Sequence, residues 1–127
     1  MTASLTPTLA LDFLTALSAD IRAAAVLDAS GAPLAGPARL AEAARGLVGA
    51  GGDASWSALE GDDARGKVFV ARDERHVIVV VTGPFALARV TRHDLRTALS
   101  ALGGQNAPIG PPGLLGEART GALLSAV

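Results

Sequence analysis

Two histidines and a few acidic side chains are the residues of this chain best suited to metal or acid–base chemistry. His76 begins an apolar run, and His93 lies in a polar segment. Neither histidine has an Asp, a Glu or a second His at the spacing that metal ligands need. We therefore expect both to be solvated side chains, and the sequence predicts no metal site.

The pairs Asp62-Asp63 and Asp73-Glu74 are the candidates for catalysis by two carboxylates. Both pairs lie in turn-like segments, where aspartate is favoured because its side chain bonds the local backbone. A catalytic pair needs burial that raises the pKa of one carboxyl, and an exposed turn provides none. The sequence predicts two turns here.

The run Gly49-Ala50-Gly51-Gly52 has the composition of a phosphate-binding loop but the wrong position. It follows a predicted helix, whereas a phosphate loop precedes one and ends in a lysine. Ser30, Ser55 and Ser57 show no nucleophile-elbow pattern, and the chain has no cysteine. We therefore expect no cofactor and no catalytic activity of the chain's own.

Composition favours a single folded domain. The chain has 127 residues, of which 50% are hydrophobic and 18% charged, and this excludes a disordered chain. A net charge of −1 argues against general binding to nucleic acid. The N-terminus has no basic residue before its apolar positions, and no apolar run is long enough to span a bilayer. We expect a cytoplasmic protein without membrane insertion.

The spacing of apolar residues predicts an α/β domain over residues 6–103. Residues 104–127 are expected to form a Gly/Pro-rich linker and a C-terminal tail, in which Leu114–Val127 becomes helical when docked. A strand that is apolar on both faces is a central strand covered on both sides, which is the expectation for His76–Thr82. The other predicted strands are Arg22–Leu27, Ala32–Gly36, Ala54–Leu59 and Lys67–Arg72, and helices begin at Pro7, after the N-cap Thr6, at Pro37 and at the capping box Thr91–Asp94.

Two segments carry a resemblance to a known family. The first is Ala24-Ala25-Val26-Leu27-Asp28-Ala29-Ser30-Gly31-Ala32-Pro33-Leu34-Ala35. The second is Val77-Ile78-Val79-Val80-Val81, which continues through Phe85–Val90 into Arg92-His93-Asp94-Leu95-Arg96. With the order of elements, they resemble the roadblock/dynein-light-chain family. The resemblance implies a profilin-like fold, with a five-stranded antiparallel sheet that has one helix on one face and two on the other.

The same resemblance implies action through protein contacts. Roadblock proteins typically form homodimers by pairing middle strands edge to edge and second helices side by side. They scaffold complexes or bind Ras-like small GTPases, and some bacterial members stimulate GTP hydrolysis. We expect partner binding through Arg39, Glu42 and Arg45, although a solvated helix face also explains these charges. The expected dimer interface comprises Trp56, Ser55, Ser57, Leu59 and Leu47, and ordinary partial core burial is the other interpretation of Trp56.

Two further functions stay open. A small-molecule sensor of the PAS or GAF type also has a sheet flanked by helices, but an aromatic content of 3% disfavours a lined pocket. An enzyme subunit without its own active site is indistinguishable from a scaffold by sequence. A sensor-kinase complex is the alternative partner to a small GTPase.

Overall fold

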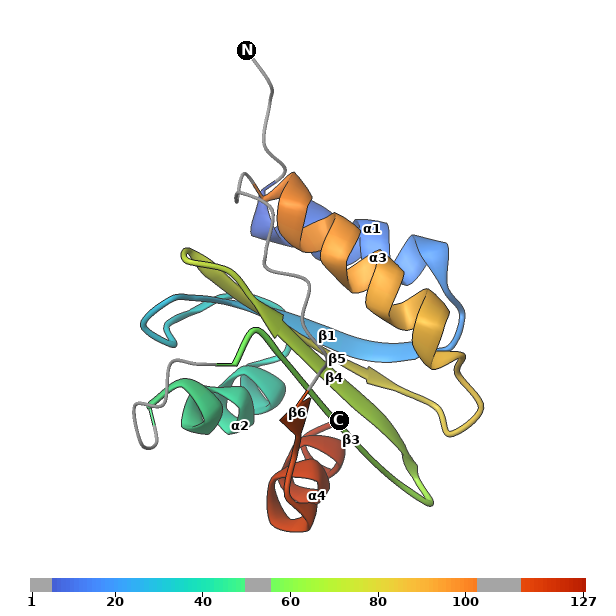
Figure 1. The fold of residues 1–127 in the computed structure, drawn as a ribbon. Coiled ribbons are helices and arrows are strands. Elements are labelled where there is room, and N and C mark those ends of the chain that lie inside the picture. Colours follow the sequence, from blue (N-terminus) through green and yellow to red (C-terminus); the bar gives the residue numbers. More distant parts are fainter. Residues whose placement is uncertain (1–5, 50–55, 103–112) are drawn as a thin grey trace.

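A six-stranded sheet with helices on both faces forms the fold (Figure 1). The computed structural model describes residues 6–49, 56–102 and 113–127. The strand order in the sheet is β2-β1-β5-β4-β3-β6. The elements are α1 (Pro7–Leu17), β1 (Ile21–Asp28), β2 (Pro33–Ala35), α2 (Ala38–Gly49), β3 (Ala58–Asp63), β4 (Gly66–Arg72), β5 (His76–Thr82), α3 (Ala88–Ala101), β6 (Gly113–Leu114) and α4 (Glu117–Ser125).

Each face of the sheet carries one hydrophobic cluster. On one face α1 and α3 cover the strands, and Leu14 and Leu99 pack there with Ile78 and Val80. On the other face α2 and α4 cover the strands, where Leu40 packs among residues that include Val77, Val79 and Val81. Alternate residues of β5 therefore point into the two clusters, as expected for a strand buried on both sides. The prediction that His76–Thr82 is central is confirmed, because β5 lies between β1 and β4.

The predicted sheet and helix arrangement is wrong in two details. Strands β1 to β5 pair antiparallel, as expected, but β6 adds a sixth strand that runs parallel to β3. Two helices lie on each face among the described elements, rather than one and two, because α4 packs beside α2. Residues 113–127, which we call the C-terminal cap, account for both differences.

The third strand begins and ends later than predicted. Glu60-Gly61-Asp62-Asp63 reads as a turn by composition, yet these residues lie in β3 and pair with β4. The turn follows at Ala64-Arg65, where the carboxylate of Asp63 accepts from the Arg65 backbone N–H at 2.7 Å and pairs with its guanidinium at 2.9 Å. These hydrogen bonds lower the pKa of Asp63. An Asp capping its own turn is locally favoured, but pairing with β4 decides which Asp does so.

Two of the predicted local signals are confirmed. The Thr6 hydroxyl accepts from the Leu9 backbone N–H at 3.2 Å and caps α1. The Asp28 carboxylate accepts from the backbone N–H groups of Ser30 and Ala32, both at 2.9 Å, while Gly31 takes a φ of 94°. The Ser30 hydroxyl also donates to this carboxylate, and together these bonds lower the pKa of Asp28. Short-range turn and cap chemistry is thus readable from the sequence.

The predicted capping box at Thr91–Asp94 is wrong. Helix α3 begins at Ala88, and its N-cap Leu87 makes no side-chain capping bond. Thr91 lies within the first turn, where its backbone N–H donates to the Leu87 carbonyl at 3.0 Å. Thr91 and Asp94 are both buried against the rest of the domain. Helix α3 therefore begins before the capping motif, because its apolar residues, such as Leu95 and Leu99, pack in the core cluster and stabilise a longer helix.

Candidate interaction surface

The edge of β3 is covered where the dimer was expected to form. Strand β6 pairs with β3 in register Leu59↔Gly113 and Glu60↔Leu114. The Leu115 backbone N–H donates to the Glu60 carbonyl at 2.8 Å. A dimer was expected to pair this strand edge with that of a second copy, but in the described structure the C-terminal cap supplies the outermost strand beside β3.

Trp56 lies just before β3 and is half-buried against the core cluster under α2. The Arg72 guanidinium lies 3.9 Å from the centre of its ring, within the range of a cation–π contact. The Arg72 Nε also donates to the Trp56 carbonyl at 2.7 Å. These contacts fix Trp56 in place, and the residue stays partly exposed.

The other predicted interface residues lie in different environments. Leu47 is only 5% exposed and holds α2 on the sheet. Leu59 is half-buried, and the Ser57 backbone carbonyl accepts from the Arg72 backbone N–H at 2.9 Å. Ser55 lies outside the described residues. Trp56, Ser57 and Leu59 thus follow one stretch of chain, whereas Leu47 belongs to the core beneath the neighbouring helix, and their role in a dimer stays a prediction.

The predicted partner-binding residues share an exposed face of α2. Arg39, Glu42 and Arg45 are all solvent-exposed, as the helical period predicts. Beside them an open groove of about 630 Å³ lies between α2 and α4, lined in part by Arg39, Glu42 and Ser125. This surface combines charges of both signs with a shallow apolar floor, and it is the candidate site of partner contact.

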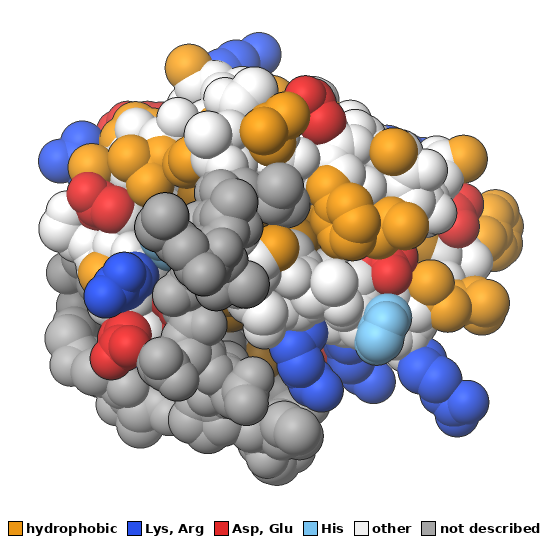
Figure 2. Space-filling model, turned by 90° about the horizontal axis from the view of Figure 1, so that it is seen from above, with side chains coloured by type: hydrophobic (Ala, Val, Ile, Leu, Met, Phe, Trp, Pro, Cys, Tyr) orange, Lys and Arg blue, Asp and Glu red, His pale blue; other side chains and the backbone are white. Residues whose placement is uncertain are grey.

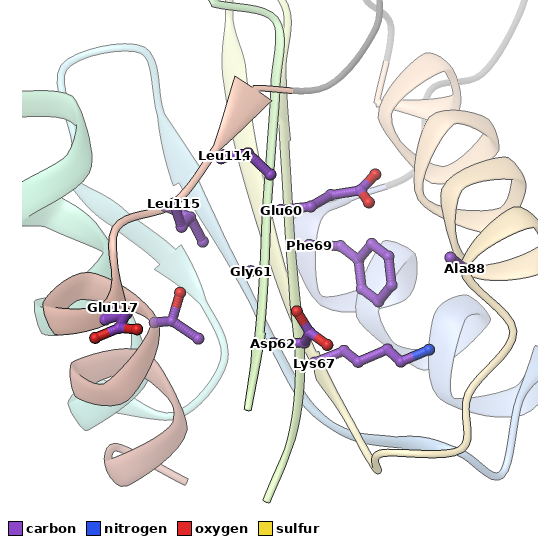
Figure 3. A pocket seen from close by; sticks show the side chains of 10 residues that line it. Glu60, Gly61, Asp62, Lys67, Phe69, Ala88, Leu114, Leu115 and Glu117 are labelled. Carbon is purple, nitrogen blue, oxygen red and sulfur yellow. The ribbon is translucent and has the colours of Figure 1, made fainter. Parts of the chain in front are cut away.

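A second hollow of about 320 Å³ follows the edge of β3 (Figure 3). Glu60 and Lys67 extend toward α3 on one side of the sheet, whereas Leu115 and Glu117 lie on the other. Glu60 forms a two-pronged ion pair with Arg92, which raises the pKa of the Arg92 guanidinium, and Lys67 Nζ donates to the Ala86 carbonyl at 2.8 Å. Glu60, Lys67 and Arg92 are thus engaged within the fold, so the side of the hollow toward α3 is a structural seam.

The pairing of Glu60 with Arg92 was not predicted from the sequence. Glu60 and Arg92 are far apart along the chain, and their pairing depends on α3 lying over the end of β3. No local sequence motif predicts a contact between residues so far apart in the chain.

The face of α1 and α3 is a separate surface (Figure 2). Hydrophobic side chains are scattered there between polar groups, and Lys and Arg side chains gather along one margin. Phe85 is 91% exposed, and Leu87 and Val90 near the start of α3 are also exposed. Exposed apolar side chains in one neighbourhood are a feature of contact surfaces, so this face competes with α2 as a docking site.

Within residues 6–49, 56–102 and 113–127, no group of three or more His, Asp or Glu side chains is placed to hold a metal ion. His76 is half-buried at the start of β5 and His93 is exposed on α3. Asp73 accepts from the backbone N–H groups of Arg75 and His76, both at 2.8 Å, so it shapes its turn as predicted. None of the helices in the described part of the chain combines the length and apolar character of a membrane span.

Comparisons with known proteins identify the fold. No protein-family model matches the sequence, and a search of curated proteins finds no match. A Roadblock/LC7 domain from Streptomyces avermitillis is similar in structure, with a TM-score of 0.60 and 19% identity, over 72% of this chain and 93% of that chain. Acanthamoeba castellanii profilin IB has a TM-score of 0.52 and 15% identity, over 77% of this chain and 98% of that chain. The chain thus has the fold that roadblock domains share with profilin.

Proposed function

We propose that this chain is a non-catalytic protein of the roadblock family, which forms homodimers and binds a Ras-like small GTPase in the cytoplasm. The observation that carries the proposal is the exposed, mixed-charge face of α2 on a fold shared with a roadblock domain. Charged groups at the rim of an interface steer association and select the partner. The chain then acts by recognition through Arg39, Glu42 and Arg45.

The nucleotide state of the GTPase provides the basis for selectivity. The γ-phosphate orders the switch loops of a small GTPase, and hydrolysis releases them. A rigid helix face binds an ordered loop with a smaller loss of conformational entropy. We therefore expect the GTP form to bind more tightly. Any effect on GTP hydrolysis would be exerted on the GTPase's own active site, as the resemblance to bacterial roadblock proteins implies.

The sensor alternative of PAS or GAF type gains no support. A ligand pocket is a largely closed apolar cavity with a few convergent polar groups. The two hollows described above open to solvent, and Glu60 and Lys67 of one are engaged within the fold. The structural likeness is to a roadblock domain and a profilin.

The test is a pull-down with a Ras-like GTPase encoded beside this gene, loaded with GTP or GDP. The double variant Arg39→Glu/Arg45→Glu is expected to weaken capture of the GTP form about tenfold or more while the domain stays folded, since both side chains are exposed. The matched control is Arg89→Glu/Arg96→Glu, which makes the same charge change on exposed positions of α3.

Each outcome of the pull-down has a distinct meaning. Preferential capture of the GTP form, lost only in the α2 variant, supports the proposal. Equal capture of both nucleotide forms would leave a passive scaffold without switch recognition. Absence of capture by the folded chain would remove the GTPase as partner, and co-purification of a sensor kinase would replace it.

A further inference from the structure

The C-terminal cap occupies the edge of β3 from within the same chain. Its strand β6 pairs with Leu59 and Glu60, and Leu115 bonds the Glu60 carbonyl. Backbone groups alternate in direction along a strand, so the N–H and C=O of Asp62 point to the same side as those of Glu60. Strand β6 ends before it reaches Asp62. Strand β6 thus pairs with the first half of β3, and α4 of the same cap contacts β3 as well.

The cap also occupies the sheet face beside α2. Leu115, Leu123 and Leu124 are buried in the same cluster as Ala44 and Leu47 of α2. Helix α4 lies alongside α2, and the open groove runs between them. The cap therefore pairs with the edge of β3 through β6 and also covers the sheet face beside α2 through α4.

The fit of the cap depends on small residues. A Cβ atom at Gly61 would lie 2.1 Å from the Thr120 Oγ1 and 3.0 Å from the Leu115 Cβ. A Cβ at Gly113 would lie 2.9 Å from the Leu59 Cδ2. Strand β6 has only two residues, so few backbone bonds hold this close packing. Such a contact can open without disturbing the antiparallel core of the sheet.

Removal of the cap would create a surface suited to a second copy of this chain. Leu59, Val68 and Val70 would lose their cover, next to a strand edge with unpaired backbone groups. A two-fold contact brings the same strand edge and the same apolar area together from both copies. The exposed face of α2 carries both Arg39 and Glu42, so charges of opposite sign can meet across the axis.

We propose that the C-terminal cap closes the homodimer surface in cis, and that dimerisation through β3 and α2 requires its release. This inference rests on the homodimer of the proposed function. Because both copies must release the cap, the apparent dimer Kd falls with the square of the released fraction. A tenfold rise in that fraction then lowers the Kd about a hundredfold.

Two adjacent leucines provide a matched test. Both leucines belong to the cap. Leu115 is 8% exposed and packs in the core cluster, whereas Leu114 is 89% exposed to solvent. Leu115→Asp places a charge in the apolar cluster and drives release, because burying an unpaired carboxylate is unfavourable. Leu114→Asp adds the same charge in solvent. Light scattering at about 10–100 μM is expected to show a monomer for the parent chain and Leu114→Asp, and a dimer for Leu115→Asp.

Hydrogen exchange at the Leu115 amide identifies the state of the cap in each species. The proposal predicts slow exchange in the monomer and fast exchange in the dimer. A parent dimer with a protected Leu115 amide would overturn it, as would a Leu115→Asp variant that is folded, uncapped and monomeric. Should Leu115→Asp fail to fold, Gly61→Ala displaces the cap by contact with Thr120, and Gly116→Ala is the control with no neighbour within 4 Å.

The measurement is made without any GTPase, so the two proposals fail separately. A chain that captures the GTPase but never releases its cap retains the GTPase binding of the proposed function and loses this inference. A chain whose dimer appears only on release, but that captures no GTPase, retains the inference and loses the partner.

Discussion

Gly36→Ala is expected to lower the free energy of unfolding by about 2–4 kcal/mol. Gly36 follows β2 and takes a φ of 102°, which side chains of L-residues rarely adopt. An added Cβ would also lie 2.5 Å from the Ala24 carbonyl oxygen and 2.7 Å from the Ala25 Cα. Both contacts are with β1, so the chain that leads into α2 would have to move away from the sheet. Urea unfolding monitored by circular dichroism measures the change.

Gly46→Ala is the matched control for this prediction. Gly46 lies within α2, and a Cβ there would meet no atom within 4 Å. Alanine in a helix interior is favoured over glycine, so this variant is expected to gain about 0.5–1 kcal/mol. If both variants had the same stability as the parent chain, the close approach of residue 36 to β1 would be contradicted.

Leu123→Ala is expected to lower the free energy of unfolding by about 2–5 kcal/mol. Leu123 is fully buried between α4 and the sheet, so its truncation leaves a cavity where relaxation is limited. The free energy with which the cap docks on the sheet can be smaller than this loss. The cap of the variant then dissociates before the domain unfolds, and the measured loss equals the docking free energy. Equilibrium unfolding and hydrogen exchange in β3 report the two cases.

The control for the second prediction is Leu114→Ala, which removes the same atoms from a side chain that is almost fully exposed. Its free energy of unfolding is expected to stay within about 0.5 kcal/mol of the parent value. Equal stability of Leu123→Ala and Leu114→Ala would show that the cap does not pack on the sheet.

The fold was largely predictable because most of its elements are encoded locally. A few neighbouring residues are enough to recognise several of these elements. They include β5, which is apolar on both faces, the N-cap Thr6 and the turn at Asp28. The end of β3 and the start of α3 were misplaced by a few residues. At both places pairing or packing with distant parts of the chain overrides a local turn or capping motif.

The candidate site was predictable only in part. The exposed face of α2 follows from helical periodicity, so the solvent exposure of Arg39, Glu42 and Arg45 was predicted, while their role in partner binding stays a prediction. The cover on β3 was not foreseen, since a two-residue parallel strand has no periodicity and its partner lies far along the chain. Glycines such as Gly61 and Gly113 were read as loop formers, whereas here they make room for close packing of the cap.

These positions define what the chain presents to a partner. Helix α2 lies over β1 and β2, and α4 packs between it and the β3 side of the sheet, while the exposed apolar side chains at Phe85 and Leu87 lie near the start of α3 across the sheet. A partner that recognises one of these surfaces leaves the other free. The location of binding therefore distinguishes the proposed function from recognition by the α1 and α3 face.

Mapping of amide chemical shifts by NMR is the most direct test of the proposed recognition surface. The ¹⁵N-labelled chain would be titrated with the GTP-loaded GTPase and, separately, with the GDP-loaded form. We predict that the GTP form perturbs the amides of Ala38–Gly49, the helix that carries Arg39, Glu42 and Arg45. Perturbations confined to α1 and α3, or none at saturating concentrations of the GTP form, would contradict it.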